Sequence, residues 1–360
     1  MTHDLGEWTD DHMGNKERLI VGIDIGSHAV KMCQLQKLTD AYKLVAVGSA
    51  TIPPGAVEDG VLQKPDEVGE IISNLAKNLK IKNKKVGISI SGYSVIVKKL
   101  SLESMDEDDL SEYINREAEQ YIPFDAKDVY IDFKKIYKNN PSKDRVDVML
   151  VAAKKEIVDS YITMLRSINF NTVLVDVDGF ALENIWETFT QGIQNVVLVD
   201  VGASKMNINI ISDGVSVLAR DIVVGSEQLT EQIATQLDIE YEEAEKIKLG
   251  SIDSGDTSEK ISYIYNQTCT QWILEIKKAI DLYSANNPDK PLQQLVLSGG
   301  GSKVNGLKEY VEKEIKLNVV TFNPFEKMVI DHDKFDELYL RSISSEMAIA
   351  AGLAIRKIPF

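Results

Sequence analysis

Two stretches of the chain, far apart in sequence, share one pattern. Residues 18–35 read RLIVGIDIGSHAVKMCQL, and residues 195–211 read NVVLVDVGASKMNINII. Each is an apolar strand that ends in Asp-x-Gly, followed by a turn of small and hydroxyl-bearing residues and a second alternating strand. Asp24 and Gly26 correspond to Asp200 and Gly202. This internal repeat predicts two β-rich halves of related fold that face each other across a cleft.

Composition narrows the classes of protein that the repeat can belong to. A chain of 360 residues predicts two or more domains. The net charge of −16 argues against a nucleic-acid binder, because binding to a phosphate backbone depends on clustered Lys and Arg. Two cysteines, Cys33 and Cys269, form neither a disulfide framework nor a CxxC metal motif, which favours a reducing cytoplasm.

The sequence has no segment that predicts membrane insertion. No apolar run approaches the ~18 residues of a membrane-spanning helix. Residues 1–17 are polar and lack the apolar core of a signal peptide, so we expect a disordered leader. We expect any contact with a membrane to be made through protein partners.

Between the two repeats lies a segment with its own order of elements. It begins with a strand, SVIVKKLSL, and continues with a helix for which Ser104 and Glu107 form a capping-box pattern. Two strands separated by the turn KNNPSKD follow, and then a helix over 155–168. The order predicts an inserted β-α-β-β-α module at 93–172.

Gly299, Gly300 and Gly301 follow the apolar strand QQLVLS and precede a helix. Glycines permit positive φ and let a ligand approach the backbone, whose amides can then face a phosphate. The stretch is neither a GxxxxGK[ST] loop nor a GxGxxG fingerprint. By itself it also fits an ordinary turn.

The three glycine-containing turns together are more specific than each one. Asp24 and Asp200 can each aim a carboxylate into the cleft, and two carboxylates suit Mg²⁺, which keeps most of its water ligands. The turn amides suit the β- and γ-phosphates of a nucleotide. Lys31, seven residues after Asp24, adds a point charge. The alternative for each hairpin is that Asp and Gly simply form turns.

In this order, Asp-Ile-Gly-Ser, Asp-Val-Gly-Ala-Ser and Leu-Ser-Gly-Gly-Gly-Ser resemble the two phosphate loops and the adenosine loop of the actin/chaperone/sugar-kinase ATPase superfamily. The resemblance implies an α/β, actin-like (ribonuclease H-like) duplicated two-domain fold with a nucleotide cleft, and ATP and Mg²⁺ as cofactors. Asp24 and Asp200 would hold Mg²⁺ through water. The implied cofactor-binding residues are Gly26, Ser27, His28, Lys31, Gly202, Ala203, Ser204, Glu245, Lys248, Gly299, Gly300, Gly301 and Ser302.

Three of the implied positions carry an alternative or a departure. AEKIKLG resembles the AE-x-IK helix of bacterial actins, in which Glu245 and Lys248 would contact ribose and adenine; the alternative is a solvated i,i+3 pair. Asp178 stands where relatives have Glu or Gln near the attacking water. It would be a general base of short reach or, alternatively, the N-cap of the next helix. His28 stands where small residues are common and has no assigned role. We therefore expect ATP binding with at most weak ATPase activity.

Within the superfamily, the module at 93–172 resembles the inserted subdomain of FtsA and of the PilM family of type IV pilus assembly proteins. REAEQYIPFDAKDVYIDF and VDVDGFALENIWE resemble PilM, and the final EMAIAAGLAIRKIPF lacks the amphipathic tail of FtsA. The implied domains are 18–92 with 173–192 and 344–360 (subdomain 1A), the module 93–172 (subdomain 1C), and 193–343, of which roughly 226–290 is subdomain 2B.

The resemblance also implies a function and partners. It implies a cytoplasmic scaffold, peripheral to the inner membrane, whose nucleotide state biases its conformation. A groove between subdomains 1A and 1C would bind the cytoplasmic N-terminal peptide of PilN, with Tyr121, Ile122 and Phe124 as candidate groove residues. Further expected partners are the pilus motor ATPases, other pilus inner-membrane components and a second copy of the chain. The alternatives are an FtsA-like cell-division polymer and a small-molecule kinase on the same fold.

Overall fold

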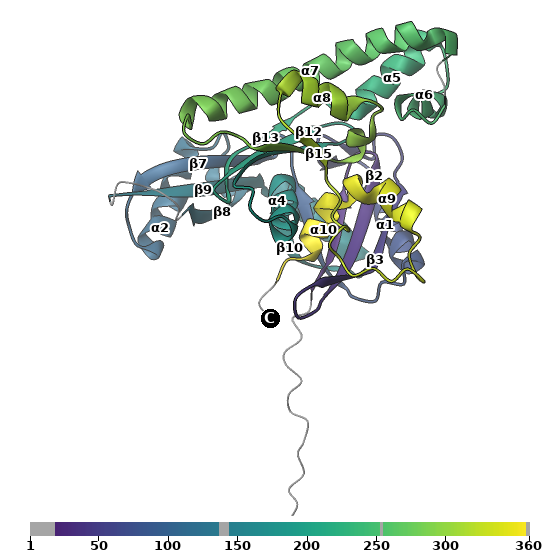
Figure 1. Cartoon of the computed structure of the whole chain (residues 1–360). Coiled ribbons are helices and arrows are strands. Elements are labelled where there is room, and N and C mark those ends of the chain that lie inside the picture. Colours follow the sequence, from purple (N-terminus) through teal and green to yellow (C-terminus); the bar gives the residue numbers. More distant parts are fainter. Residues whose placement is uncertain (1–18, 137–143, 253–254, 358–360) are drawn as a thin grey trace, which may run out of the picture.

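The computed structural model describes residues 19–136, 144–252 and 255–357. The predicted leader at 1–17 and residues 138–143 of the predicted turn lie outside the described residues. Figure 1 shows two large sheets in the body of the molecule and a smaller sheet that projects to one side. Within the described part, no helix combines the length and the apolar character needed to cross a bilayer.

The two large sheets have the same topology. In each, three consecutive antiparallel strands are followed by two strands that pair in parallel, the first of them beside the strand that carries the aspartate. The first sheet has the order β3 (Tyr42–Thr51), β2 (Ala29–Lys37), β1 (Val21–Ile25), β6 (Lys85–Ile90) and β10 (Asn171–Val177). The second has the order β13 (Val215–Ile222), β12 (Met206–Ser212), β11 (Asn195–Val201), β14 (Gln294–Ser298) and β15 (Val319–Thr321). The repeat predicted for one hairpin therefore extends to the whole sheet.

Each large sheet is covered on both faces, which explains its continuous apolar strands. Along β11, Val196 and Leu198 face one core while Val197 and Val199 face the other. Helices that belong to one sheet cover its outer face. These are α1 (Pro65–Asn78) and α3 (Lys155–Ser167) for the first sheet, and α5 (Ser226–Leu237), α6 (Tyr241–Lys248), α7 (Ser258–Asn286) and α8 (Leu307–Ile315) for the second.

Two helices lie between the sheets and share a core with both, α4 (Asp178–Phe189) and α10 (Ala348–Ala354). Glycines allow the close packing. A Cβ atom on Gly22 of β1 would lie 2.0 Å from the carbonyl oxygen of Ala350, and one on Gly352 would lie 1.8 Å from that of Ala181. The backbones of β1, α10 and α4 are therefore in direct contact at the centre of the molecule.

The inserted segment forms a three-stranded antiparallel sheet with the order β7 (Val95–Glu103), β9 (Arg145–Lys154) and β8 (Val129–Ile136). Helix α2 (Glu107–Glu117) packs on it through Leu110 and Ile114. The predicted capping box is wrong. The chain is still extended at Ser104, whose N–H donates to Asp144, and the helix begins after Asp106, whose side chain accepts from the Asp109 N–H at 2.8 Å.

Helix α3 follows the inserted sheet in sequence but packs largely elsewhere. Its residues Ile157, Tyr161 and Leu165 share the core of α1 and the first sheet. Val158 contacts the base of the inserted sheet, near Val95. Packing therefore makes α3 a bridge between the inserted sheet and the body of the molecule.

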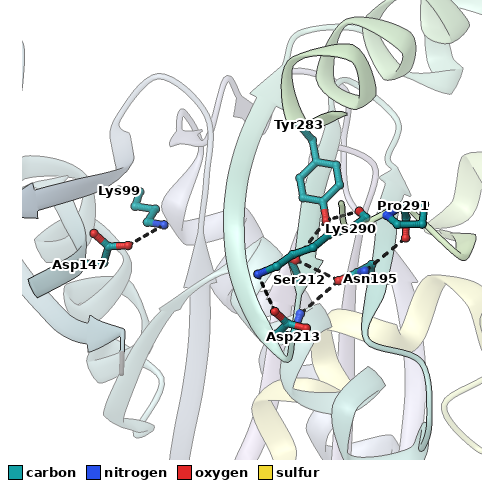
Figure 2. Close-up of polar contacts among 8 residues, drawn as sticks. All are labelled: Lys99, Asp147, Asn195, Ser212, Asp213, Tyr283, Lys290 and Pro291. Atoms are coloured by element: carbon teal, nitrogen blue, oxygen red, sulfur yellow. Dashed lines mark hydrogen bonds and ion pairs between the residues drawn. The ribbon is translucent and has the colours of Figure 1, made fainter. Parts of the chain in front are cut away.

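Figure 2 shows a polar network at the end of the second sheet where helix α7 finishes. The Tyr283 hydroxyl lies 3.0 Å from Ser212 Oγ and 2.8 Å from the carbonyl oxygen of Lys290. Ser212 Oγ donates to Asn195 Oδ1 at 2.9 Å, and Lys290 Nζ pairs with Asp213 at 2.7 Å. These bonds fix the end of α7 to β11 and β12.

Candidate functional site

The two Asp-x-Gly hairpins have matching backbone geometry. Asp24 lies opposite Lys31 in the β1–β2 register, and Asp200 lies opposite Asn207 in the β11–β12 register. In each turn the glycine N–H donates to the residue three positions later, at 3.1 Å from Gly26 to Ala29 and 2.8 Å from Gly202 to Lys205. The turns are therefore equivalent elements of the two halves.

Asp24 and Lys31 form an ion pair within the first hairpin, with Lys31 Nζ 3.0 Å from Asp24 Oδ2. Burial raises the pKa of Asp24, and Lys31 only partly opposes this rise. Burial also acts to lower the pKa of Lys31, but the charge and hydrogen bond of Asp24 outweigh it and the net shift is upward. Lys31 thus stays charged beside the carboxylate that the sequence analysis assigned to Mg²⁺.

Asp200 is placed differently, because its partner is a neutral hydroxyl. Ser298 Oγ of the neighbouring strand β14 donates to Asp200 Oδ2 at 2.7 Å. Burial raises the pKa of Asp200 to about 6, and the charges of Asp24 and Asp178 contribute to the rise. The same interactions show that the three carboxylates lie close enough to affect one another.

Asp178 is the first residue of α4, and the helix N-cap is Val177 without a capping side chain, so the N-cap alternative is wrong. Its Oδ2 instead accepts from Ser91 Oγ at 2.5 Å and pairs with Lys205 Nζ at 3.1 Å. Burial acts to raise the pKa of Asp178, but Lys205 and the hydrogen bonds outweigh it and the pKa is lowered. The carboxylate is held ionised.

Lys205 is the residue of this site that the sequence analysis missed. It ends the turn of the second hairpin and reaches Asp178, which belongs to the helix after the first sheet. In sequence it looks like an ordinary turn lysine. One signal was available, because the second hairpin repeats the first and Lys205 stands two residues before Asn207, the position that corresponds to Lys31.

The triple glycine forms a short 3₁₀ turn, Gly300–Lys303, directly after β14. Gly299 has φ of +82°, and a Cβ there would lie 2.3 Å from the Val201 carbonyl oxygen. A Cβ on Gly301 would lie 2.5 Å from the Val201 side chain. These two glycines accommodate the end of β11. Only Gly300 borders open space, since a Cβ there would meet nothing closer than Glu346 Oε2 at 3.8 Å.

Glu245 and Lys248 lie on α6, close to the glycine turn. Their charged groups pair at 2.7 Å, and Lys248 Nζ also reaches the carbonyl oxygen of Ser226 at 3.3 Å. Burial lowers the pKa of Lys248, so the alternative of a solvated pair does not fit. The Asn305 N–H donates to the Lys248 carbonyl at 3.1 Å, which joins α6 to the chain after the glycine turn.

The remaining predicted residues lie on or beside the turns. Ser27, Ala203 and Ser204 are partly exposed, and His28 is exposed, with only its carbonyl oxygen engaged by the Ile52 N–H. Ser302 is buried, and its hydroxyl donates to the Gly299 carbonyl at 2.7 Å.

Ser204, Lys205 and Asn207 of the second hairpin also line a cavity of about 360 Å³, which we call the junction groove. Its walls come from three parts of the molecule. These are the loop before β7, the inserted sheet together with Pro123 and Phe124 that follow α2, and the second hairpin with β13. The lining includes Tyr93, Val97, Phe124, Lys205, Asp221 and Val223. A second cavity of about 760 Å³ lies among α5, α6, α7 and α8 and includes Lys248 and Asn305 in its wall.

The arrangement fits a magnesium–polyphosphate ligand in charge and donor type. Asp24, Asp178 and Asp200 face two ammonium groups, Lys31 and Lys205, and Asp200 lacks an ion-pair partner among the described residues. In the same part of the chain, no three His, Cys, Asp or Glu side chains converge to hold a metal ion. This donor set suits an ion that keeps most of its waters.

Comparisons with known proteins agree with the geometry. The model of the family described as "Type IV pilus assembly protein PilM" matches residues 22–358. The fold is similar to a chain of the PilM-PilN type IV pilus biogenesis complex (TM-score 0.84, 24% identity, 96% of this chain and 100% of that chain covered). It is also similar to the ethanolamine utilization protein EutJ from Carboxydothermus hydrogenoformans (TM-score 0.54, 16% identity, 93% and 89% covered).

A third similar structure is MreB 5 of Spiroplasma citri bound to AMPPNP (TM-score 0.51, 12% identity, 93% and 94% covered). The duplicated sheets and these neighbours together show the actin-like α/β fold that the sequence motifs predicted.

Proposed function

The chain belongs to the PilM family of type IV pilus assembly proteins, and on this premise we propose that it is an ATP-binding scaffold of the pilus machine. It binds the cytoplasmic N-terminal peptide of PilN and links that inner-membrane protein to the assembly motor. The structural match to a PilM-PilN complex supports PilN as the partner. The family match favours this function over an FtsA-like polymer or a small-molecule kinase.

The nucleotide site is proposed from one observation. Two equivalent hairpins each carry an aspartate, and Asp24 and Asp200 lie close enough to affect each other's charge. We call the region of these aspartates, Asp178, Lys31 and Lys205 the charged junction. Asp24 and Asp200 would hold Mg²⁺ through water, and the turns with Lys31 would hold the phosphates. Glu245, Lys248 and Gly300 would border the nucleoside. Bound Mg²⁺ would attract both aspartates and the phosphates would attract Lys31, so Mg·ATP would draw the two hairpins together. Asp178, with its lowered pKa, is a weak proton acceptor, in line with slow hydrolysis at most.

The domain assignment is part of the proposal. Subdomain 1A would comprise 18–92, 173–192 and 344–360, subdomain 1C the module 93–172, and the second domain 193–343 with 2B at roughly 226–290. The shared sheet topology supports the division into two large domains, and the separate core of the inserted sheet supports subdomain 1C. Helix α3, at the end of 93–172, packs instead in the core of the first sheet.

The junction groove is the proposed contact for the partner peptide. The sequence predicted a groove between subdomains 1A and 1C, whereas the junction groove lies mainly between the inserted sheet and the second hairpin with β13 of the second domain. Phe124, one of the three predicted groove residues, lines it. Tyr93, whose side chain is 71% exposed, stands beside it. Ile122 is buried in the core of the inserted sheet, and the Tyr121 hydroxyl contacts that of Tyr113, so both are structural. An exposed aromatic beside an apolar groove is typical of a peptide-binding site.

The proposal is tested by calorimetry with the full chain and a synthetic cytoplasmic N-terminal peptide of PilN. Phe124→Ala should weaken binding about tenfold or more, because it removes an aromatic wall of the groove. Tyr263→Ala is the matched control, since Tyr263 is 64% exposed on the distant helix α7. No binding by the wild type, or equal binding by both variants, would contradict the assignment.

A further inference from the structure

Lys205 and Lys31 hold different positions in hairpins that are otherwise equivalent. Lys31 lies opposite its own aspartate, Asp24, whereas the matching position in the second hairpin is Asn207. The amide of Asn207 donates to Asp221 at 2.7 Å. The lysine of the second hairpin is two residues earlier, at the end of the turn.

That shift changes what the lysine contacts. Lys31 neutralises a carboxylate of its own sheet, but Lys205 extends from the second sheet to Asp178 at the start of α4, 3.1 Å away. Only about a quarter of the Lys205 side chain is exposed, at 26%. The ammonium group is thus partly buried, it belongs to the second glycine turn, and its charge acts on Asp24 of the first hairpin.

The Lys205 ammonium lies 3.1 Å from the Oδ2 atom of Asp178. The same Oδ2 atom accepts from Ser91, and this hydrogen bond remains available if the lysine leaves. A phosphate oxygen is a stronger competitor for an ammonium group than a shared carboxylate oxygen, because it brings a second charge and further acceptors. Exchange of Lys205 from Asp178 to phosphate leaves Asp178 with the Ser91 hydrogen bond but without a cation, so the phosphate must hold the lysine strongly enough to offset that loss.

We propose that Lys205 is a second phosphate-binding lysine. It is paired with Asp178 in the free protein and moves to the polyphosphate when a nucleotide binds. This inference rests on the proposed nucleotide site and adds a residue and a direction of exchange to it. Lys205 also lines the junction groove, so its movement changes the wall of the groove at the same time.

The experiment measures affinities of the full chain for ATP, ADP, AMP and adenosine, with Mg²⁺, by calorimetry. Lys205→Met should lower ATP affinity about tenfold to a hundredfold and leave adenosine affinity unchanged. Lys205→Arg should restore most of the loss. Asp178→Asn should raise ATP affinity, because it releases the lysine and keeps the Ser91 hydrogen bond.

The two variants are expected to change ATP affinity in opposite directions, and this distinguishes phosphate binding by Lys205 from a purely structural role. If the ion pair only fixes the two halves, Lys205→Met and Asp178→Asn break the same contact and change affinity in the same direction. That result, or an unchanged preference for ATP over adenosine in Lys205→Met, would overturn the inference.

Lys99→Met is the matched control, since it removes a partly exposed ion pair with Asp147 at 2.9 Å in the inserted sheet (Figure 2). It should bind all four ligands like the wild type. Failure of the wild type itself to bind ATP would instead refute the nucleotide site as a whole. Thermal melting of each variant confirms that it is folded.

Discussion

Asp24 and Asp200 occupy equivalent positions in the repeat, yet their surroundings differ. Asp24 is paired with an ammonium group, and Asp200 is hydrogen-bonded to a neutral serine. An ionised carboxylate in a buried place without a cation is costly. The negative charge of Asp200 therefore destabilises the metal-free protein, and a bound metal ion would offset this cost.

This predicts how stability depends on pH in metal-free buffer. The pKa of Asp200 rises from an ordinary 3.8 to about 6 in the folded protein. Between these values the folded chain binds more protons than the unfolded chain, so the Asp200 contribution to the free energy of unfolding falls as pH rises. Asp200→Asn should match the wild type near pH 4 and exceed it at pH 7.5 by at most ~3 kcal/mol. Urea unfolding at the two pH values checks this; an equal difference at both would contradict it.

The same variant should have the opposite effect on ligand binding. Asp200→Asn and Asp24→Asn should each weaken Mg·ATP binding by about tenfold or more, because each removes a charged acceptor for the metal-bound waters. In EDTA the Asp200→Asn loss should disappear, since Asp200 acts on ATP only through the metal. Calorimetry with and without Mg²⁺ distinguishes the cases. Unchanged Mg·ATP affinity in both variants would exclude the two aspartates from the site.

Single residues differ in how far sequence could predict them. Asp24, Lys31 and Asp200 follow from local pattern, because a hairpin register is a short-range property. The Lys205–Asp178 pair depends on how α4 packs against the second sheet, which no local pattern encodes. Gly299 and Gly301 were predicted to make room for a ligand, but their nearest neighbour is Val201 of the chain itself.

At the scale of elements, the central contact is the one among β1, α10 and α4. The apolar pattern predicted the strand β1, which is present. It did not predict that α10 would lie between the sheets, because an all-apolar helix has no polar face to mark its orientation. The start of α2 was also misplaced, since Ser104 and Asp106 are both good caps and only the length of β7 decides between them.

Gly352→Ala tests this contact. The new methyl group would overlap the Ala181 carbonyl, so we expect a loss of about 1–3 kcal/mol or more in the free energy of unfolding. Gly69→Ala in α1 is the matched control, because its Cβ would meet Ile168 and Met164 at 3.4–3.5 Å, an ordinary contact. There the better helix propensity of alanine should stabilise the fold by up to about 1 kcal/mol. Urea midpoints that shift in the same direction would refute the packing argument.

At the scale of the whole molecule, the charged junction and the junction groove share residues. Lys205 lines both, and Asp221 of β13 lines the groove while it accepts from the Gly92 N–H of the loop before β7, at 2.5 Å. A change in the distance between the two halves must therefore alter the groove. The repeat in sequence predicted two facing halves, but the groove that joins them to the inserted sheet needed the three-dimensional structure.

The shared residues predict reciprocal coupling between nucleotide and peptide. ATP should change the affinity for the PilN peptide by a factor of about five or more, and the peptide should change ATP affinity by the same factor. Asp221→Ala should bring this factor closer to one, since it removes the bond between Gly92 and β13. Paired calorimetric titrations measure both factors. Independent binding by the wild type would show that the two sites are not linked.

The packing of α10 on β1 has a consequence for biosynthesis. Gly22 leaves the ribosome among the first residues of the described chain, but its neighbour Ala350 is added more than three hundred residues later. The part of the first sheet that α10 covers therefore stays exposed until residues 348–354 are synthesised, although α4 can pack on the same face earlier. Until then the nascent protein offers chaperones an apolar surface.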